Sequence, residues 1–257
     1  MSILQVIISG IVQGITEFLP ISSDGHLAIL HGYFKLTQTD LFFDVCLHIG
    51  TLFSVLIFFR KRILELIQKK DLKYFLYLSL GTVPAVIAGL LFEKNISSFY
   101  DNAVIVSLSL FFTGSMLFVG QFFLSETYRG KRGVNFLDSI VVGIMQAIAL
   151  LPGVSRSGMT ISTALIRKIK AEEAFNFSFL LSVPAVLAAV IYETFKVLKG
   201  VEPILNPAWN YILGIIISFL VGLVSLPLLA RVINGRKLYL FGIYCFIIGG
   251  VAFFLLK

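Results

Sequence analysis

The sequence predicts an all-α integral membrane protein with six transmembrane helices and two re-entrant helix–loop–helix hairpins. Of its 257 residues, 58% are hydrophobic and only 14% are charged, and the mean hydropathy is +0.95. Soluble domains typically have about a quarter of their residues charged, so this chain has too little polar surface to cover a soluble fold. The same composition excludes disordered, collagen-like and disulfide-scaffold proteins.

Six apolar stretches are long enough to be transmembrane helices, because about 30 Å of hydrocarbon takes roughly 20 residues to cross. They cover residues 41–59, 74–93, 104–124, 177–198, 211–230 and 238–256.

Two further apolar stretches are interrupted by loops rich in Pro, Ser and Gly, and we expect each to be a hairpin. Residues 3–19 lead through such a loop into 27–34, and residues 137–151 lead through another into 159–166. At 1.5 Å per residue, the second piece of each pair is only about 12 Å long, which is too short to span a bilayer. Non-helical backbone at membrane depth is tolerated where protein or a wet cavity surrounds it.

The basic residues set the expected orientation. Fifteen of the 21 lysines and arginines fall in four short segments, which the positive-inside rule assigns to the cytoplasm. These segments are 60–73, 129–132, 167–170 and 231–237, which leaves loops near 35–40, 94–103 and 199–210 outside, together with Lys257. The net charge of +7 therefore reflects topology, and no nucleic-acid partner is expected.

When the six spans are placed so that these four segments are cytoplasmic, each hairpin enters and leaves the membrane by the same face. The chain becomes one membrane domain, 1–257, whose halves, approximately 1–125 and 135–257, form an inverted repeat. A match between Gly10–Ile15 and Gly143–Ile148 supports this arrangement. A second match, between 83–88 and 183–188, conflicts with it, because those spans run in the same direction.

Polar side chains gather in the two interrupted hairpins, where they are costly and therefore indicate function. Gln13 and Glu17 are four residues apart and share a helix face, and a Gly- and Ser-rich loop that opens a helix offers N–H groups to an anion. Arg156 is a planar cation suited to phosphate. The candidate site residues are Gln13, Glu17, Ser22, Ser23, Asp24 and His26 in the first hairpin and Ser155, Arg156, Ser157, Gly158 and Thr160 in the second.

This set of groups fits phosphoryl chemistry. A hydroxyl can attack phosphorus while a base takes its proton, and Arg156 can stabilise charge on the phosphoryl oxygens. Glu17 can bind a divalent cation, for which we expect Mg²⁺ or Ca²⁺. Magnesium usually takes one or two protein carboxylates and completes its shell with substrate phosphates.

Structural alternatives exist for many of these residues. Serines in such loops often cap helices, and Glu17 with Arg156 could be a structural ion pair. Packing roles are favoured for His31 and His48, helix-start roles for Asp44 and Asp138, and small-hydrophobe roles for Cys46 and Cys245. Gln146 mirrors Gln13.

The two loops resemble those of the BacA-type undecaprenyl-pyrophosphate phosphatase family. The resemblance lies in residues 13–26, in 152–160 and in 177–184, and the spacing of the spans extends it over the whole chain. It implies an enzyme of the bacterial plasma membrane that hydrolyses undecaprenyl pyrophosphate to the monophosphate and inorganic phosphate. It further implies an outward-facing site, a divalent cation and a link to bacitracin resistance.

The resemblance also implies residue roles. Glu17 would be the essential acidic residue, Ser23 the nucleophile, His26 an acid or base, and Arg156 the phosphate-binding cation. Further pocket residues would be Gln13, Ser22, Ser155, Ser157, Gly158 and Thr160. Gln13 stands where the family motif has Glu or Gln, and Asp24 has no assigned role.

Two other function classes stay open at this point. Inverted repeats with broken helices are typical of transporters, so the chain could move a polyprenyl phosphate or another anion without covalent chemistry. A structural partner in envelope assembly is the third alternative. The sequence also leaves open whether Ser23 or water attacks phosphorus. It does not fix the oligomeric state, and a homodimer is possible. Without basic residues before its first apolar stretch, the chain is expected to begin near Met1 when mature.

Overall fold

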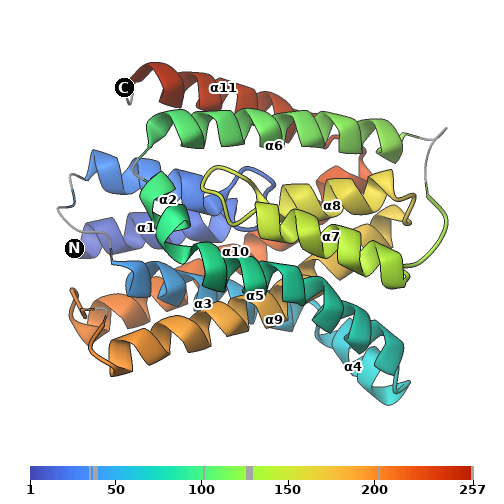
Figure 1. Cartoon of the computed structure of the whole chain (residues 1–257), viewed down its shortest axis with the longest axis horizontal. Helices are drawn as coiled ribbons and strands as arrows, with labels where there is room; N and C mark the ends of the chain where they lie inside the picture. The colour runs from blue at the N-terminus through green and yellow to red at the C-terminus, as the bar shows by residue number, and fades with distance from the viewer. Residues whose placement is uncertain (35, 37–39, 101, 126–129, 202, 256–257) are drawn as a thin grey trace.

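A computed structural model describes residues 1–34, 36, 40–100, 102–125, 130–201 and 203–255. In these ranges the regular elements are α-helices, apart from one isolated β-bridge between Arg132 and Ile169 (Figure 1). The helices are α1 (Ile3–Thr16), α2 (Ser23–Tyr33), α3 (Leu41–Phe58), α4 (Arg60–Gln68), α5 (Leu72–Tyr100), α6 (Ala103–Leu124), α7 (Phe136–Ile148), α8 (Arg156–Ile166), α9 (Ala171–Leu198), α10 (Ala208–Asn234) and α11 (Tyr239–Leu255).

Five of the described helices are long and apolar enough to cross a membrane, namely α3, α5, α6, α9 and α10. The chain is therefore an all-α, multi-pass membrane protein, as predicted. The last predicted span corresponds to α11, which has 17 residues and a length of about 26 Å at 1.5 Å per residue. The hairpin helices α1 and α7 are also apolar but shorter.

One predicted loop is wrong. The apolar stretch ends near residue 93, but α5 continues to Tyr100 and α6 begins at Ala103, so the expected loop 94–103 is nearly all helix. A helix does not stop where hydrophobicity stops, because Glu and Lys are good helix formers. The break is made by Asn102, whose side-chain oxygen accepts hydrogen bonds from the N–H groups of Val104 and Ile105 at 3.1 and 3.2 Å.

The two predicted interruptions are present. Helix α1 ends at Thr16 and α2 begins at Ser23, while α7 ends at Ile148 and α8 begins at Arg156. In Figure 1 the two connecting loops meet in the middle of the molecule. Their backbones touch, because a Cβ placed on Gly25 of α2 would lie 3.1 Å from Cα of Gly153 in the second loop.

Small residues let the long helices approach closely. Helix α10 packs against α1 and α3, α5 packs against α7 and α9, and α6 packs against α11. At the α3–α10 crossing, a Cβ on Gly50 would lie only 2.0 Å from Oγ of Ser218. In membrane proteins, packing of this kind takes the place of the hydrophobic effect in holding helices together.

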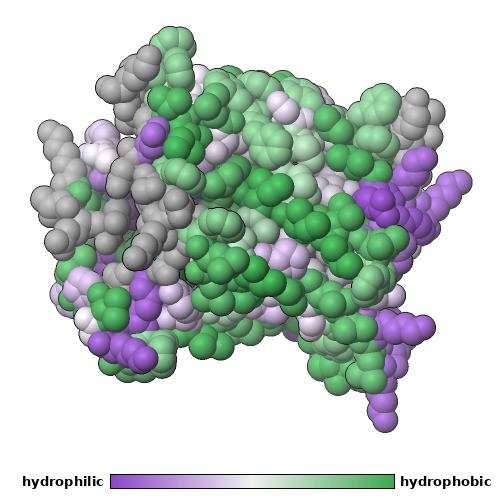
Figure 2. Space-filling view, viewed as in Figure 1, coloured by the Kyte–Doolittle hydropathy of each residue, from purple (hydrophilic) through white to green (hydrophobic). Residues whose placement is uncertain are grey.

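The basic residues collect at one end of the molecule, which we call the basic end. It carries Arg60–Lys73 around α4 and the turns at Lys131–Arg132, Arg167–Lys170 and Arg231–Lys237, and it is the purple right-hand end in Figure 2. Between the two ends the visible surface is mostly green, as a lipid-facing surface must be. Asp138 is fully buried at the basic end and is ion-paired with Arg132 and Arg167.

Candidate active site

A cavity of about 690 Å³ lies where the two loops meet, which is within the size range of small-molecule sites. One wall is polar and is built from both loops, α2 and α3. The other wall consists largely of small apolar residues of α5 and α9. The polar lining residues are Thr16, Glu17, Ser22, Ser23, Asp24, His31, Asp44, His48, Gln146, Ser155 and Arg156, together with Tyr192 and Glu193 of α9, and the apolar ones include Ala85, Gly89, Ala185, Ala188 and Ala189.

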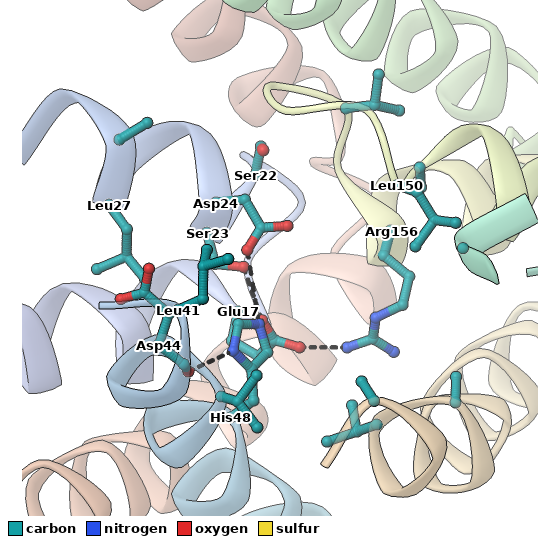
Figure 3. Close-up of a pocket in the computed structure, with 18 of the residues that line it drawn as sticks. Glu17, Ser22, Ser23, Asp24, Leu27, Leu41, Asp44, His48, Leu150 and Arg156 are labelled. Carbon is teal, nitrogen blue, oxygen red and sulfur yellow. Dashed lines mark hydrogen bonds and ion pairs between the residues drawn. The ribbon is translucent and has the colours of Figure 1, made fainter. Parts of the chain in front are cut away.

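Glu17 is the centre of the polar wall (Figure 3). It lies just beyond the end of α1 and is 7% exposed. Its Oε1 accepts a hydrogen bond from Nη2 of Arg156 at 2.5 Å, and its Oε2 accepts from Oγ of Ser23 at 2.7 Å and from Nε2 of Gln13 at 3.1 Å. Side chains from both loops therefore meet at one carboxylate.

Ser22 determines the backbone conformation immediately before Ser23. It is the N-cap of α2, and its hydroxyl accepts a hydrogen bond from the N–H of Gly25 at 3.3 Å. Its φ angle of 69° is left-handed, a conformation uncommon for residues other than glycine. Such strained backbone persists only when the surrounding structure holds it.

The second loop presents Arg156 in a similar way. Ser155 caps α8, and its Oγ accepts from the N–H of Gly158 at 3.1 Å and lies 3.3 Å from Oγ of Ser157. Oγ1 of Thr160 donates to the carbonyl of Arg156 at 2.8 Å. Ser155 and Arg156 line the cavity, whereas Ser157, Gly158 and Thr160 lie behind it.

Thr113 of α6 is a supporting residue that the sequence analysis did not find. It is fully buried. Its Oγ1 donates to the carbonyl of Gly153 and accepts from the N–H of Ser155, both at 3.0 Å. In the sequence, Thr113 is visible only as a lone threonine in an apolar span. Nothing in the sequence connects it with a loop 40 residues away.

The structure places the histidines differently from expectation. His26 does not line the cavity; its Nδ1 donates to the carbonyl of Ser22 at 2.7 Å, and its Nε2 lies 2.8 Å from the hydroxyl of Tyr244. His48 of α3, for which packing was favoured, lines the cavity. Its Nε2 lies 3.5 Å from Oε2 of Glu17 and 3.6 Å from Oδ1 of Asp24.

Asp44 fills two roles. It stands in the first turn of α3, as expected of a helix-start residue, although the N-cap itself is Asp40. It also lines the cavity, where its Oδ1 lies 3.6 Å from Nε2 of His31. Neither of these two atoms has a hydrogen-bond partner.

The carboxylates of the polar wall limit how a divalent cation can bind. The described residues contain no group of three or more His, Cys, Asp or Glu side chains arranged to hold a metal, and Arg156, Ser23 and Gln13 already engage the carboxylate of Glu17. Asp24 is the second carboxylate beside His48. One or two carboxylates fit a cation that shares its shell with substrate phosphates, as Mg²⁺ commonly does.

Comparison with known proteins extends over almost the whole chain. The family described as bacitracin resistance protein BacA matches residues 6–251. The undecaprenyl-diphosphatase of Methanococcus maripaludis is 39% identical over 250 residues, which cover 95% of this chain and 96% of the relative. Those of Korarchaeum cryptofilum and Syntrophotalea carbinolica are 36% and 38% identical, over 97% and 98% of both chains respectively. The chain therefore belongs to the BacA family.

Proposed function

We propose that this protein hydrolyses undecaprenyl pyrophosphate to undecaprenyl phosphate and inorganic phosphate. The observation that carries the proposal is the meeting of Ser23, Glu17 and Arg156 on one wall of a cavity whose other wall is apolar. A pyrophosphate can bind at the first wall while its polyprenyl chain stays among alanines and lipid. The curated relatives described above are all named undecaprenyl-diphosphatase, and none of them is named a transporter.

In the proposed reaction, Oγ of Ser23 attacks the terminal phosphorus and Glu17 takes its proton. The Ser23–Glu17 hydrogen bond of 2.7 Å supports this pairing of nucleophile and base. A bond forms between Oγ and phosphorus, the bond from phosphorus to the bridging oxygen breaks, and undecaprenyl phosphate leaves. Water then hydrolyses the phosphoserine. In the alternative, water attacks phosphorus directly and Ser23 orients it.

Arg156 would bind the pyrophosphate oxygens and stabilise charge that develops on them. Its Nη2 pairs with Glu17, while its Nη1 is buried without a hydrogen-bond partner, and the residue lines the cavity. Gln13 would hold the Glu17 carboxylate in place, and the caps made by Ser22 and Ser155 would fix the two helix starts.

A divalent cation, Mg²⁺ or Ca²⁺, would be held by Asp24 and Glu17 together with the substrate phosphates. When bound, it would neutralise charge on the pyrophosphate. Both carboxylates line the cavity, and one or two suffice for a cation that shares its shell with phosphates.

For the topology, we propose six transmembrane helices and two re-entrant hairpins in an inverted repeat with halves approximately 1–125 and 135–257. Matching positions of the two hairpins are 133 residues apart, as in Gly10 and Gly143 or Ser22 and Ser155. The packing supports the same pairing, since α1 lies on α10 as α7 lies on α5.

We propose a plasma-membrane location with the cavity facing outward. The cavity takes residues 41–48 from α3, whose other end adjoins the basic end, and residues 185–193 from α9, which starts at the basic end. The cavity therefore lies on the side away from the positive charges that mark the cytoplasmic face.

The test is release of phosphate from a long-chain polyprenyl pyrophosphate by purified protein in detergent, with and without a chelator. Detergent removes the two compartments that a transporter needs. Ser23→Ala and Arg156→Ala should nearly abolish release while the protein stays folded. The matched control is Ser115→Ala, because the exposed hydroxyl of Ser115 bonds only to its own helix. Wild-type turnover in both site variants would overturn the assignment of residues.

A further inference from the structure

The contact between His26 and Tyr244 involves the helix that begins at Ser23 and has no part in the reaction described above. The two rings are stacked, with centroids 5.7 Å apart and planes 10° apart. His26 belongs to α2 and Tyr244 to α11. The contact therefore joins the helix that carries Ser23 to the last helix of the chain.

Both nitrogens of the His26 ring are engaged. Its Nδ1 faces a carbonyl oxygen and must therefore carry a proton, which leaves Nε2 of the neutral ring to accept the hydrogen bond from the Tyr244 hydroxyl. Since His26 does not line the cavity either, the ring has no free atom with which to exchange a proton with substrate.

The carbonyl that His26 holds belongs to Ser22, the residue with the left-handed φ angle. That carbonyl is part of the peptide bond leading to Ser23, so its orientation sets the direction of the Ser23 side chain. It accepts two hydrogen bonds, one from Nδ1 of His26 at 2.7 Å and one from the His26 backbone N–H at 3.3 Å. Neighbouring Cys245 of α11 adds a weak bond from its thiol to the carbonyl of Pro20 at 3.7 Å.

The second loop has a comparable support. Thr113 of α6 holds the carbonyl of Gly153 and the N–H of Ser155, one residue before Arg156. Helices α6 and α11 pack against each other. Each therefore braces one loop of the site from behind.

We propose that His26 and Tyr244 are positioning residues, which hold the Ser22 peptide so that Ser23 points at Glu17, and that His26 transfers no proton in the reaction. The inference rests on the proposed function for its kinetic test. It assigns Tyr244 a role and changes the one that the resemblance implied for His26.

The first experiment compares Tyr244→Phe with Tyr239→Phe, a change on the same helix at a tyrosine of similar exposure, 38% against 36%. Tyr244→Phe removes one hydroxyl and keeps the stacked ring. We expect it to lower kcat about 3- to 10-fold with KM unchanged, because the nucleophile is misdirected while the phosphate-binding groups stay in place. Tyr239→Phe should match wild type. Equal kcat in the two variants would overturn the inference.

The second experiment separates positioning from proton transfer at His26. His26→Asn places an amide N–H near the former Nδ1 and can still hold the Ser22 carbonyl, whereas His26→Gln reaches toward Tyr244 and loses that bond. We expect His26→Asn to retain at least 10-fold more kcat than His26→Gln. Equal losses, the result for an imidazole that must carry a proton, would contradict the proposal.

A third measurement does not depend on activity. Hydrogen–deuterium exchange of peptides covering residues 20–26 should be faster in Tyr244→Phe than in Tyr239→Phe, because the Ser22 peptide loses its brace. Unchanged exchange would overturn the inference even if the wild type released no phosphate. Absence of release by the wild type would, separately, overturn the proposed function.

Discussion

The support that Thr113 gives the second loop allows a strict test of how the site is held. Thr113→Val keeps the size and β-branching of the side chain and replaces its hydroxyl with a methyl group. The carbonyl of Gly153 and the N–H of Ser155 then both lose a partner in a fully buried place. Each unsatisfied buried group costs about 1–3 kcal/mol, so we expect the free energy of unfolding to fall by about 2–4 kcal/mol once the loop relaxes.

The same change should reduce catalysis, because Arg156 directly follows Ser155. A displacement of about 1 Å in a substrate-positioning group can cost about 10²-fold in rate, and we expect kcat to fall about 10- to 100-fold. Thermal unfolding in detergent and phosphate release are the two assays. Ser115→Ala, two residues along the same helix, should shift stability by no more than about 0.5 kcal/mol. If Thr113→Val matched that control in both assays, the proposed brace would have no function.

Three further changes test the packing, the basic end and the polar wall. Gly50→Leu should prevent folding or lower the unfolding temperature strongly, because even its Cβ would overlap Oγ of Ser218, whereas Gly250→Ala, with no atom within 4 Å, should be neutral. Asp138→Asn should lower the free energy of unfolding by about 1–3 kcal/mol; the loss is small because the two arginine partners are partly exposed and solvent screens the ion pairs. The kcat of the folded variant should stay unchanged. In His48→Asn the side chain can still reach the backbone carbonyl of Asp44 but no longer contacts Glu17, so we expect kcat to fall at least about 10-fold. An unchanged rate would show that the contact between His48 and Glu17 has no part in the reaction.

The sequence predicted those features that depend on local chemistry. Long apolar runs located the spanning helices, and the two loops rich in Pro, Ser and Gly located the breaks. Glu17 and Arg156, 139 positions apart, were both candidate site residues because each stands in an interrupted hairpin, and the structure pairs them. The end of α5 was misplaced, because hydropathy marks where a helix leaves lipid and not where its hydrogen bonds stop.

The residues that support the site could not be found in this way. Thr113, His48 and Tyr244 lie in apolar spans, and their relation to the loops depends on how whole helices are placed against one another. The residues of a hairpin loop predict its local turn and caps, but they do not predict which distant helix packs against it. For the same reason His26 could be assigned to the site by its position in the motif, while the direction of its ring could not.

The bracing of the two loops also bears on how such a protein could have arisen. The first loop, at residues 17–22, is held by α11, and the second, at residues 149–155, is held by α6. Each loop therefore depends on a helix from the other half of the chain. If the two halves form the inverted repeat proposed above, a half-length ancestor would have carried a loop without its support. It would have needed a second copy inserted in the opposite direction to build this site. Gene fusion would then have joined the two copies, and the two loops would have been free to diverge into one that carries a serine and one that carries an arginine.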